Sequence, residues 1–177
     1  MSQIQVGKLR KMFPAIETLF PMLSSIDGIL DCKLASYCPI DSRLNVDLDA
    51  LSAVCSFDGK NMVLFTNETF HQIANKLYFK DKERNLIDHI SADFIAKDHK
   101  IEIFPFLLDM DRYRFITGGE HSMDMNFNYH IDVLKSPIPF DFGLNVEGKI
   151  GNFKYKPGKT RYRELFNAPI RHEGISC

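Results

Sequence analysis

The sequence predicts a mainly β (α+β) fold, in which a long, curved antiparallel sheet meanders into a half-barrel or groove and carries one main amphipathic helix at about residues 67–79. The first observation is the stretch Ser122–Val133, where apolar and polar side chains alternate without a break, as on an extended strand. The second is that similar alternation recurs along most of residues 23–157. One apolar and one polar side per strand are typical of an antiparallel sheet with one face in water.

Length and composition favour one folded domain, or one piece of a larger one. The chain has 177 residues, and an apolar fraction of 45% is enough for a buried core. The 22 basic and 23 acidic side chains leave a net charge of −1, so nucleic-acid binding is not expected. The N-terminal residues lack the apolar core of a signal peptide, and no apolar run reaches about 18 residues. The chain by itself therefore carries no recognisable signal or transmembrane segment.

The first elements are short. Residues 1–22 are expected to form a helical and irregular lead-in, because Pro14 and Pro21 interrupt a helical pattern. A strand is predicted from Leu23 to Tyr37, with a bend or bulge at Gly28.

The next segment reads as a hairpin. Alternation over residues 44–57 changes phase once, which suggests a bulge or bend. Asp58-Gly59 is a turn signal, and residues 61–66 are predicted to be the return strand.

The main helix is predicted from Asn67 to Tyr78. Thr66 or Asn67 is a suitable N-cap, and Glu68 lies in the first turn, where a carboxylate favours the helix dipole. A stripe of helical spacing is made by Phe70, Ile73, Ala74 and Leu77.

A meander follows the helix. Asp98-His99 and Gly118-Gly119 are predicted turns, and Pro105 marks a bulge or an edge position. The predicted strands are 86–97, 100–109, 113–117, 122–133, 142–146 and 153–155. The sheet domain then ends at about residue 157, and residues 158–177 are expected to form an irregular tail.

Three phrases in this region resemble the C-terminal region of the AsmA-like proteins of Bacteroidetes-type cell envelopes. They are ETFHQIANKLYFKDKERNLIDHISADF at 68–94, FPFLLDMDRYRF at 104–115 and MDMNFNYHIDVLKSPIPFDFGLNVEG at 123–148. The resemblance covers most of residues 28–163, and its phrases are structural rather than catalytic.

The resemblance implies a periplasmic envelope protein of the repeating β-groove kind, with an N-terminal membrane anchor and a role in phospholipid transport or outer-membrane assembly. This chain departs from the family because it has no anchor helix and lacks the long upstream region, so it looks like the C-terminal piece of such a protein. The implied partners are a phospholipid or another acyl-chain ligand, the upstream part of the same protein, and other envelope proteins.

The predicted sheet and the resemblance meet at one site. A curved sheet with an apolar concave face can shelter acyl chains while its polar convex face stays wet. The face of each strand depends on register, because one bulge inverts it. The expected lipid-binding lining is Met123, Met125, Phe127, Tyr129 and Ile131, with Ile101, Ile103, Leu144 and Val146 as neighbours.

Catalytic and metal-binding patterns are weak. No CxxC or HxxxH element is present, so Cys32, Cys38, Cys55 and Cys177 are expected to be buried or edge thiols. The histidines show no metal-ligand spacing: His71 lies at a helix edge, His99 and His121 in turns, and His130 beside Asp132 on a polar strand face, while His89 and His172 add no motif.

The acidic and basic residues of the DMDRYR stretch allow two interpretations. Asp109, Asp111, Arg112 and Arg114 could act as a glycosidase-like acid and base, or form cross-strand ion pairs or turn contacts. Such contacts contribute little individually at a surface and need no enzyme to explain them. We therefore predict no enzyme, no catalytic residue, no metal and no cofactor.

The alternative function is a structural or protein-interaction domain. In that case the helix at 67–78 covers the apolar face as an ordinary closed core, and an exposed sheet edge pairs with a partner strand.

Overall fold

The computed structural model describes residues 3–12, 14, 16, 20–37, 39–40, 47, 50–65, 84–110, 113–136 and 139–167. In this part of the chain one antiparallel sheet has the strand order β1-β3-β4-β5-β6-β7-β8-β9-β10, with β2 paired to β4. The strands are β1 (Gln3–Gln5), β2 (Ile26–Asp27), β3 (Ile29–Tyr37), β4 (Ser52–Phe65), β5 (Arg84–Lys97), β6 (Lys100–Met110), β7 (Tyr113–Ser122), β8 (Asn126–Lys135), β9 (Phe142–Lys149) and β10 (Asn152–Gly158). The predicted mainly β meander is confirmed.

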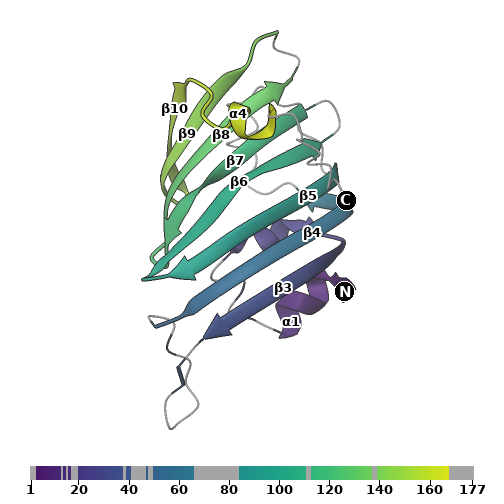
Figure 1. Cartoon of the computed structure of the whole chain (residues 1–177), viewed down its shortest axis with the longest axis vertical. Helices are drawn as coiled ribbons and strands as arrows, with labels where there is room; N and C mark the ends of the chain where they lie inside the picture. The colour runs from purple at the N-terminus through teal and green to yellow at the C-terminus, as the bar shows by residue number, and fades with distance from the viewer. Residues whose placement is uncertain are drawn as a thin grey trace, which may run out of the picture.

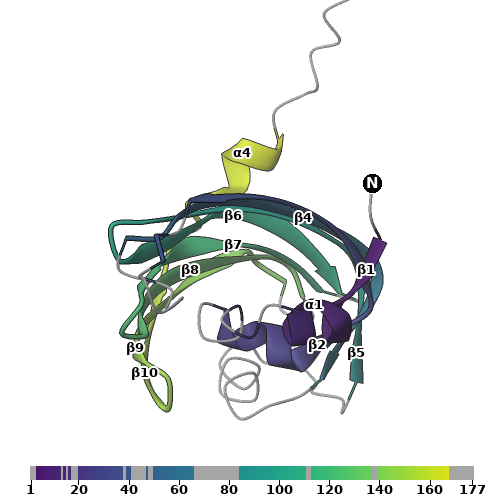
Figure 2. The same ribbon diagram turned by 90° about the horizontal axis from the view of Figure 1, so that it is seen from below.

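The sheet is an open, strongly curved half-barrel (Figure 1). Figure 2 shows helix α1 (Val6–Met12) and the 3-10 helix η1 (Pro21–Ser25) inside the curve, while helix α4 (Arg163–Asn167) lies outside it. We call the inner side the concave face and the outer side the convex face. The two ends of the described chain therefore pack on opposite faces of one sheet.

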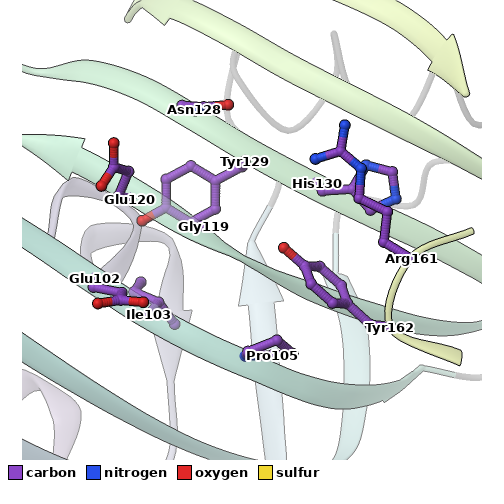
Figure 3. Close-up of a pocket in the computed structure, with 10 residues that line it drawn as sticks. All are labelled: Glu102, Ile103, Pro105, Gly119, Glu120, Asn128, Tyr129, His130, Arg161 and Tyr162. Atoms are coloured by element: carbon purple, nitrogen blue, oxygen red, sulfur yellow. The ribbon is translucent and has the colours of Figure 1, made fainter. Parts of the chain in front are cut away.

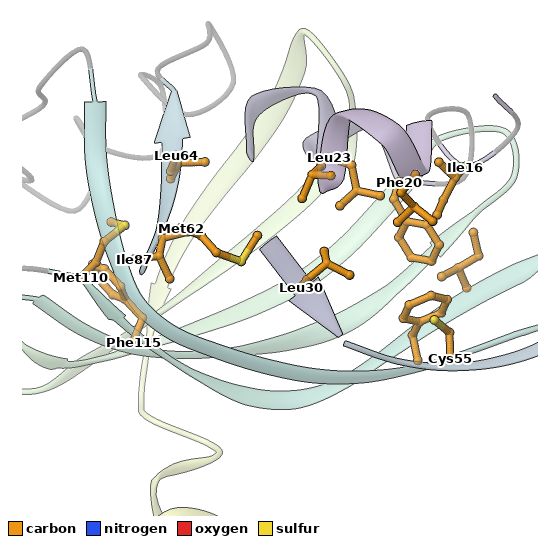
Figure 4. Close-up of a cluster of buried hydrophobic side chains, with 14 of the residues drawn as sticks. Ile16, Phe20, Leu23, Leu30, Cys55, Met62, Leu64, Ile87, Met110 and Phe115 are labelled. Atoms are coloured by element: carbon orange, nitrogen blue, oxygen red, sulfur yellow. The ribbon is translucent and has the colours of Figure 1, made fainter. Parts of the chain in front are cut away.

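The hydrophobic core lies between the N-terminal segment and the concave face. Figure 4 shows Ile16, Phe20 and Leu23 above the strands, facing side chains such as Leu30 and Cys55. Val6 and Leu9 of α1 belong to the same buried cluster. Burial of large apolar side chains stabilises a fold by roughly 1.5–3 kcal/mol each, so this segment is an integral part of the domain.

Several turns and bulges agree with the sequence. Asp98 and His99 form the two-residue β5–β6 turn, with φ of 51° and 63°. The β6–β7 register shifts between Ile103 and Phe106, so the bulge expected at Pro105 is confirmed. Gly28, with φ 142°, separates β2 from β3 as predicted.

Two predicted turns are wrong. Asp58 and Gly59 lie inside β4, and Gly118 and Gly119 lie inside β7. A Cβ on Gly59 would collide with the side chain of Met62, and a Cβ on Gly118 would lie 2.9 Å from the backbone of Pro105. These glycines allow close approach within the sheet, which a local turn pattern cannot distinguish from chain reversal.

The predicted unbroken strand Ser122–Val133 is also wrong. Strand β7 ends at Ser122, residues 123–125 turn, and β8 begins at Asn126. The amide of Met125 donates to the Ser122 carbonyl at 2.9 Å, and the amide of Asn126 donates to the Ser122 hydroxyl at 3.3 Å. Apolar and polar residues go on alternating through residues 123–125, so the sequence pattern does not reveal this turn.

The described parts near both ends of the chain contain more secondary structure than the sequence suggests. The lead-in contains the expected short helix, α1, but its first residues also form β1, which pairs with Ile29–Asp31 of β3. Residues 23–25 are 3-10 helix, so the strand starts at Ile26. The tail predicted to be irregular contains α4. The helix predicted at 67–79 lies outside the described residues, as do all positions of the predicted 44–49 strand except Asp47.

Candidate functional site

The concave side of β6–β10 is a continuous apolar wall. Antiparallel register places directly opposed residues on the same face, so each row of partners can be followed across the sheet. The first row contains Ile101, His121, Phe127, Gly148 and Phe153, and the second contains Ile103, Gly119, Tyr129, Val146 and Tyr155. The third contains Phe106, Thr117, Ile131, Leu144 and Pro157.

The wall brings together the strand residues expected to line it. All seven predicted positions within β6, β8 and β9 occur in these rows, namely Ile101, Ile103, Phe127, Tyr129, Ile131, Leu144 and Val146. Met123 and Met125 are the exceptions, because both lie in the β7–β8 turn. Met123 packs against the core cluster, whereas Met125 has φ 60° and does not continue the strand face.

An aromatic line crosses the wall. The ring of His121 stacks on Phe127 with centroids 4.9 Å apart, and Phe127 meets Phe153 edge-on at 5.6 Å. Phe153 in turn lies 6.3 Å from Tyr155 on the edge strand β10. At the other end His121 meets Phe20 of the N-terminal segment at 6.2 Å. The line therefore joins the core under the N-terminal segment to the far edge of the sheet.

One polar contact lies within this aromatic line. The hydroxyl of Tyr129 is 2.8 Å from Nδ1 of His121. The sequence predicts His121 in a turn, but the structure buries it within strand β7. Burial raises the pKa of the Tyr129 phenol. The tyrosine therefore stays protonated and acts as an apolar body with one satisfied polar atom.

Burial varies across the wall. Ile101 of β6, and Phe94 of the neighbouring strand β5, lie near the N-terminal segment and are 0% and 4% exposed. On β8 and β10 the side chains of Phe127, Tyr129 and Phe153 are only partly buried. These three side chains of β8 and β10 are thus less completely covered than the concave residues beneath α1 and η1, whereas Leu144 and Val146 of the intervening strand β9 are each only 4% exposed.

The convex face of the same strands carries a buried polar cluster. His130 and Asp132 of β8 are 2% and 0% exposed, although the sequence suggested a face turned to water. His130 Nε2 lies 2.7 Å from Asp132 Oδ1, and His130 Nδ1 lies 2.7 Å from Asn145 Oδ1. Because an ionised carboxylate only accepts hydrogen bonds, Nε2 donates to Asp132.

The C-terminal segment closes over this cluster. The backbone amides of Arg161 and Tyr162 donate to Asp132 Oδ2 at 2.9 and 2.6 Å. The Tyr162 ring meets the His130 ring edge-on at 5.4 Å. Asp132 thus binds one side chain of its own strand and two backbone amides of the C-terminal segment, so the cluster fastens this segment to the convex face of the sheet.

Figure 3 shows a small hollow beside this cluster, between the C-terminal segment and strands β6–β8. Its volume is about 260 Å³, and its polar lining includes Glu102, Glu120, Asn128, Arg161 and Tyr162. Two carboxylates and limited size make this hollow a poor host for an acyl chain.

The remaining charged candidates are surface pairs or lie outside the described residues. Arg114 Nε donates to Asp109 Oδ1 at 2.6 Å, so the predicted cross-strand ion pair is confirmed for these two residues. Asp111 and Arg112, together with His71 and His172, lie outside the described residues. His130 faces Gly118 of β7 and Asn145 of β9.

The predicted lining did not include His121, Phe153 or Tyr155, and the polar cluster of Asn145 and Arg161 was not predicted. Correct placement of the β7–β8 turn would have placed His121 on the wall. Only the folded register brings Asn145 and Arg161 to β8. Among the described residues, no group of three His, Cys, Asp or Glu side chains is arranged to hold a metal ion.

No protein-family model, no curated protein and no solved structure matches this chain. No helix in the described part of the chain is both long enough and apolar enough to cross a membrane.

Proposed function

We propose that this chain is a non-enzymatic lipid-handling or envelope-biogenesis module that shelters acyl chains against the concave wall of β6–β10. The observation that carries the proposal is the set of partly buried aromatic and aliphatic side chains on β8 and β10, namely Phe127, Tyr129, Ile131 and Phe153. The resemblance to the AsmA-like C-terminal region supports the same function and an envelope location.

The physical chemistry of the wall suits this ligand. Each buried methylene contributes roughly 0.8 kcal/mol, so about ten methylenes would contribute about 8 kcal/mol before the entropy lost on binding. Aromatic rings at 4.9–5.9 Å spacing give a broad apolar surface with no charged group in their rows. Such a surface discriminates poorly between chain lengths, which fits a carrier better than a selective receptor.

The first test is native mass spectrometry of protein purified without detergent, followed by organic extraction. We expect phospholipid at near-stoichiometric occupancy, or uptake of phospholipid from vesicles of phosphatidylethanolamine and phosphatidylglycerol. A lipid-free mass with no uptake from these vesicles would refute the proposal.

A matched pair of variants tests whether the lipid binds to the concave wall. Phe153→Asn introduces an amide on the concave side of β10, whereas Lys154→Asn makes the same residue on the opposite, exposed side. We expect Phe153→Asn to reduce bound lipid several-fold and Lys154→Asn to leave it unchanged. Thermal unfolding of both variants separates loss of binding from loss of fold, and equal lipid content in both would contradict a binding wall.

A second candidate function is supported by one sheet edge. Strand β1 pairs only with Ile29–Asp31, and no described strand pairs with the outer side of residues 33–37 of β3. These residues are exposed on both faces, with Leu34 at 50% and Tyr37 at 71%. An exposed edge of this kind can take an extended strand of a partner by main-chain pairing.

The two sheet edges differ in a way that supports this alternative. The opposite edge, β10, carries Lys154, Lys156 and Pro157, residues that discourage strand addition. The test is sedimentation velocity over a range of concentrations, together with binding of a synthetic peptide of alternating Val and Thr. Leu34→Lys should abolish association or peptide binding, and concentration-independent monomers that bind no peptide would remove this candidate.

A further inference from the structure

Two thiols lie in contact on neighbouring strands. Cys32 of β3 and Cys55 of β4 are free cysteines whose Sγ atoms are 3.6 Å apart. Cys32 lies opposite Phe57 and Cys55 lies opposite Leu34, so the two cysteines are diagonal neighbours on the concave face. No sequence pattern marks this pair, because its members are 23 residues apart and belong to different strands.

The two cysteines lie slightly farther apart than the partners of an unstrained disulfide. Diagonal neighbours in an antiparallel pair have Cα atoms roughly 7–8 Å apart, whereas disulfides usually span about 4.4–6.8 Å. The two Sγ atoms must therefore approach from 3.6 Å to about 2.05 Å, a shift of roughly 1.5 Å, to complete the bond. Strand β3 can supply this shift, because among the described strands only β4 pairs with it beyond Asp31. Strained cross-strand disulfides are the readily reduced ones.

We propose that Cys32 and Cys55 are a redox pair that closes to a reversible disulfide between β3 and β4 when the protein meets a disulfide-bearing oxidant. This site is independent of the lipid wall. It joins the exposed edge strand covalently to the core of the sheet.

The reaction is a thiol–disulfide exchange in two steps. The Cys32 thiolate attacks one sulfur of the oxidant, which forms a mixed disulfide and releases the first thiol of the oxidant. The Cys55 sulfur, losing its proton to solvent, then attacks the Cys32 sulfur and releases the second thiol. Two protein thiols lose two electrons and two protons, and the two sulfurs of the oxidant gain them.

Accessibility sets the order of attack. Cys32 is partly exposed, whereas Cys55 of β4 is 2% exposed and belongs to the hydrophobic core. Burial, and next the neighbouring Cys32, raise the pKa of the Cys55 thiol. Since the thiolate is the nucleophile, Cys32 is the entry point and Cys55 the resolving thiol.

The test uses oxidised glutathione as the oxidant and a background in which Cys38→Ser and Cys177→Ser remove the other two thiols. After oxidation, acid quenching, denaturation and alkylation, we expect a mass lower by two hydrogen atoms and no alkylated cysteine. Dithiothreitol should restore two alkylatable thiols. The oxidised form should unfold at a temperature higher by roughly 5–10 °C than the reduced form, less whatever strain the bond carries.

Single variants test which of the two cysteines reacts first with the oxidant. In that background Cys55→Ser should stop at a glutathione adduct on Cys32, and Cys32→Ser should leave Cys55 unmodified while the protein is folded. Two alkylated thiols after oxidation, or a glutathione adduct that persists on Cys32 beside an intact Cys55, would overturn the proposal. Peptide mapping of the oxidised unsubstituted chain gives a second readout: a peptide linking Cys32 to Cys55 supports the pair, and any other pairing refutes it.

Discussion

The two halves of the curved sheet are held in opposite ways. Beneath α1 and η1, the concave face of β4–β6 is filled from the inside by the N-terminal segment, where Phe20 lies 4.2 Å from the Phe94 ring. At β8 and β9 the support lies on the outside, where Asp132 binds the amides of Arg161 and Tyr162. The described chain therefore fastens the sheet from both faces: the N-terminal segment packs against the concave face, and the C-terminal segment binds the convex face.

Loss of the Asp132 contacts on the convex face should have the largest effect on the free energy of unfolding. Asp132→Ala leaves His130 buried without its carboxylate and deprives two backbone amides of their acceptor, so we expect a loss of about 3–5 kcal/mol in the free energy of unfolding. Urea denaturation measures the loss, and hydrogen exchange should show faster exchange at the amides of Arg161 and Tyr162. Asn128→Ala, an exposed change on the same side of β8, is the control. Unchanged exchange at Arg161 in Asp132→Ala would mean that the carboxylate does not hold the C-terminal segment.

Loss of packing between the N-terminal segment and the concave face should have the second largest effect on the free energy of unfolding. Phe20→Ala deletes a ring that contacts Phe57, Phe94 and His121, and we expect a loss of about 3–4 kcal/mol. Phe153→Ala, on the less covered half, should lose only about 1–2 kcal/mol. Urea denaturation of the two variants compares the halves directly. Equal losses would mean that both halves are equally closed, and this would weaken the case for a binding wall on β8–β10.

The sequence predicted the strands better than it predicted the site. The alternation at 142–146 and 153–155 and the Asp98-His99 turn are local features, so they could be found by pattern alone. Gly118 was misinterpreted because close packing and chain reversal select the same residue. That error also moved His121 into a turn and Met125 into a strand.

The polar cluster and the thiol pair could not be predicted for a different reason. The partners of Asp132 are backbone amides 29 and 30 residues away, and backbone donors leave no trace in the amino-acid letters. Cys32 and Cys55 meet only through the β3–β4 register. Chemistry that depends on register across a sheet is visible only after the strands are paired.

A smaller effect is expected at the polar contact in the wall. Tyr129→Phe removes the hydroxyl that meets His121, and we expect a loss of about 1 kcal/mol at pH 7. Burial raises the pKa of Tyr129 above its usual value of 10.0, so the folded state keeps a proton that the unfolded state releases. The contribution is complete below about pH 10 and declines as the pH rises toward the folded-state pKa, by up to about 1.4 kcal/mol per pH unit. Urea denaturation between pH 9 and pH 11 should therefore show a shallower decline in Tyr129→Phe, and identical slopes would place this hydroxyl in water.

The smallest effect is expected at the surface pair Arg114–Asp109, which belongs to neither support. Arg114 Nε and Asp109 Oδ1 are only 2.6 Å apart. Because the two side chains are 50% and 31% exposed, water and salt nevertheless screen their attraction. Arg114→Ala should change the free energy of unfolding by no more than about 0.5 kcal/mol, and that small change should shrink further at 1 M NaCl. Urea denaturation at low and high salt measures both values. A loss comparable to that of Asp132→Ala would show that a charged pair on the rim of β6–β7 also holds the curve of the sheet, and that its shape does not depend on the two chain ends alone.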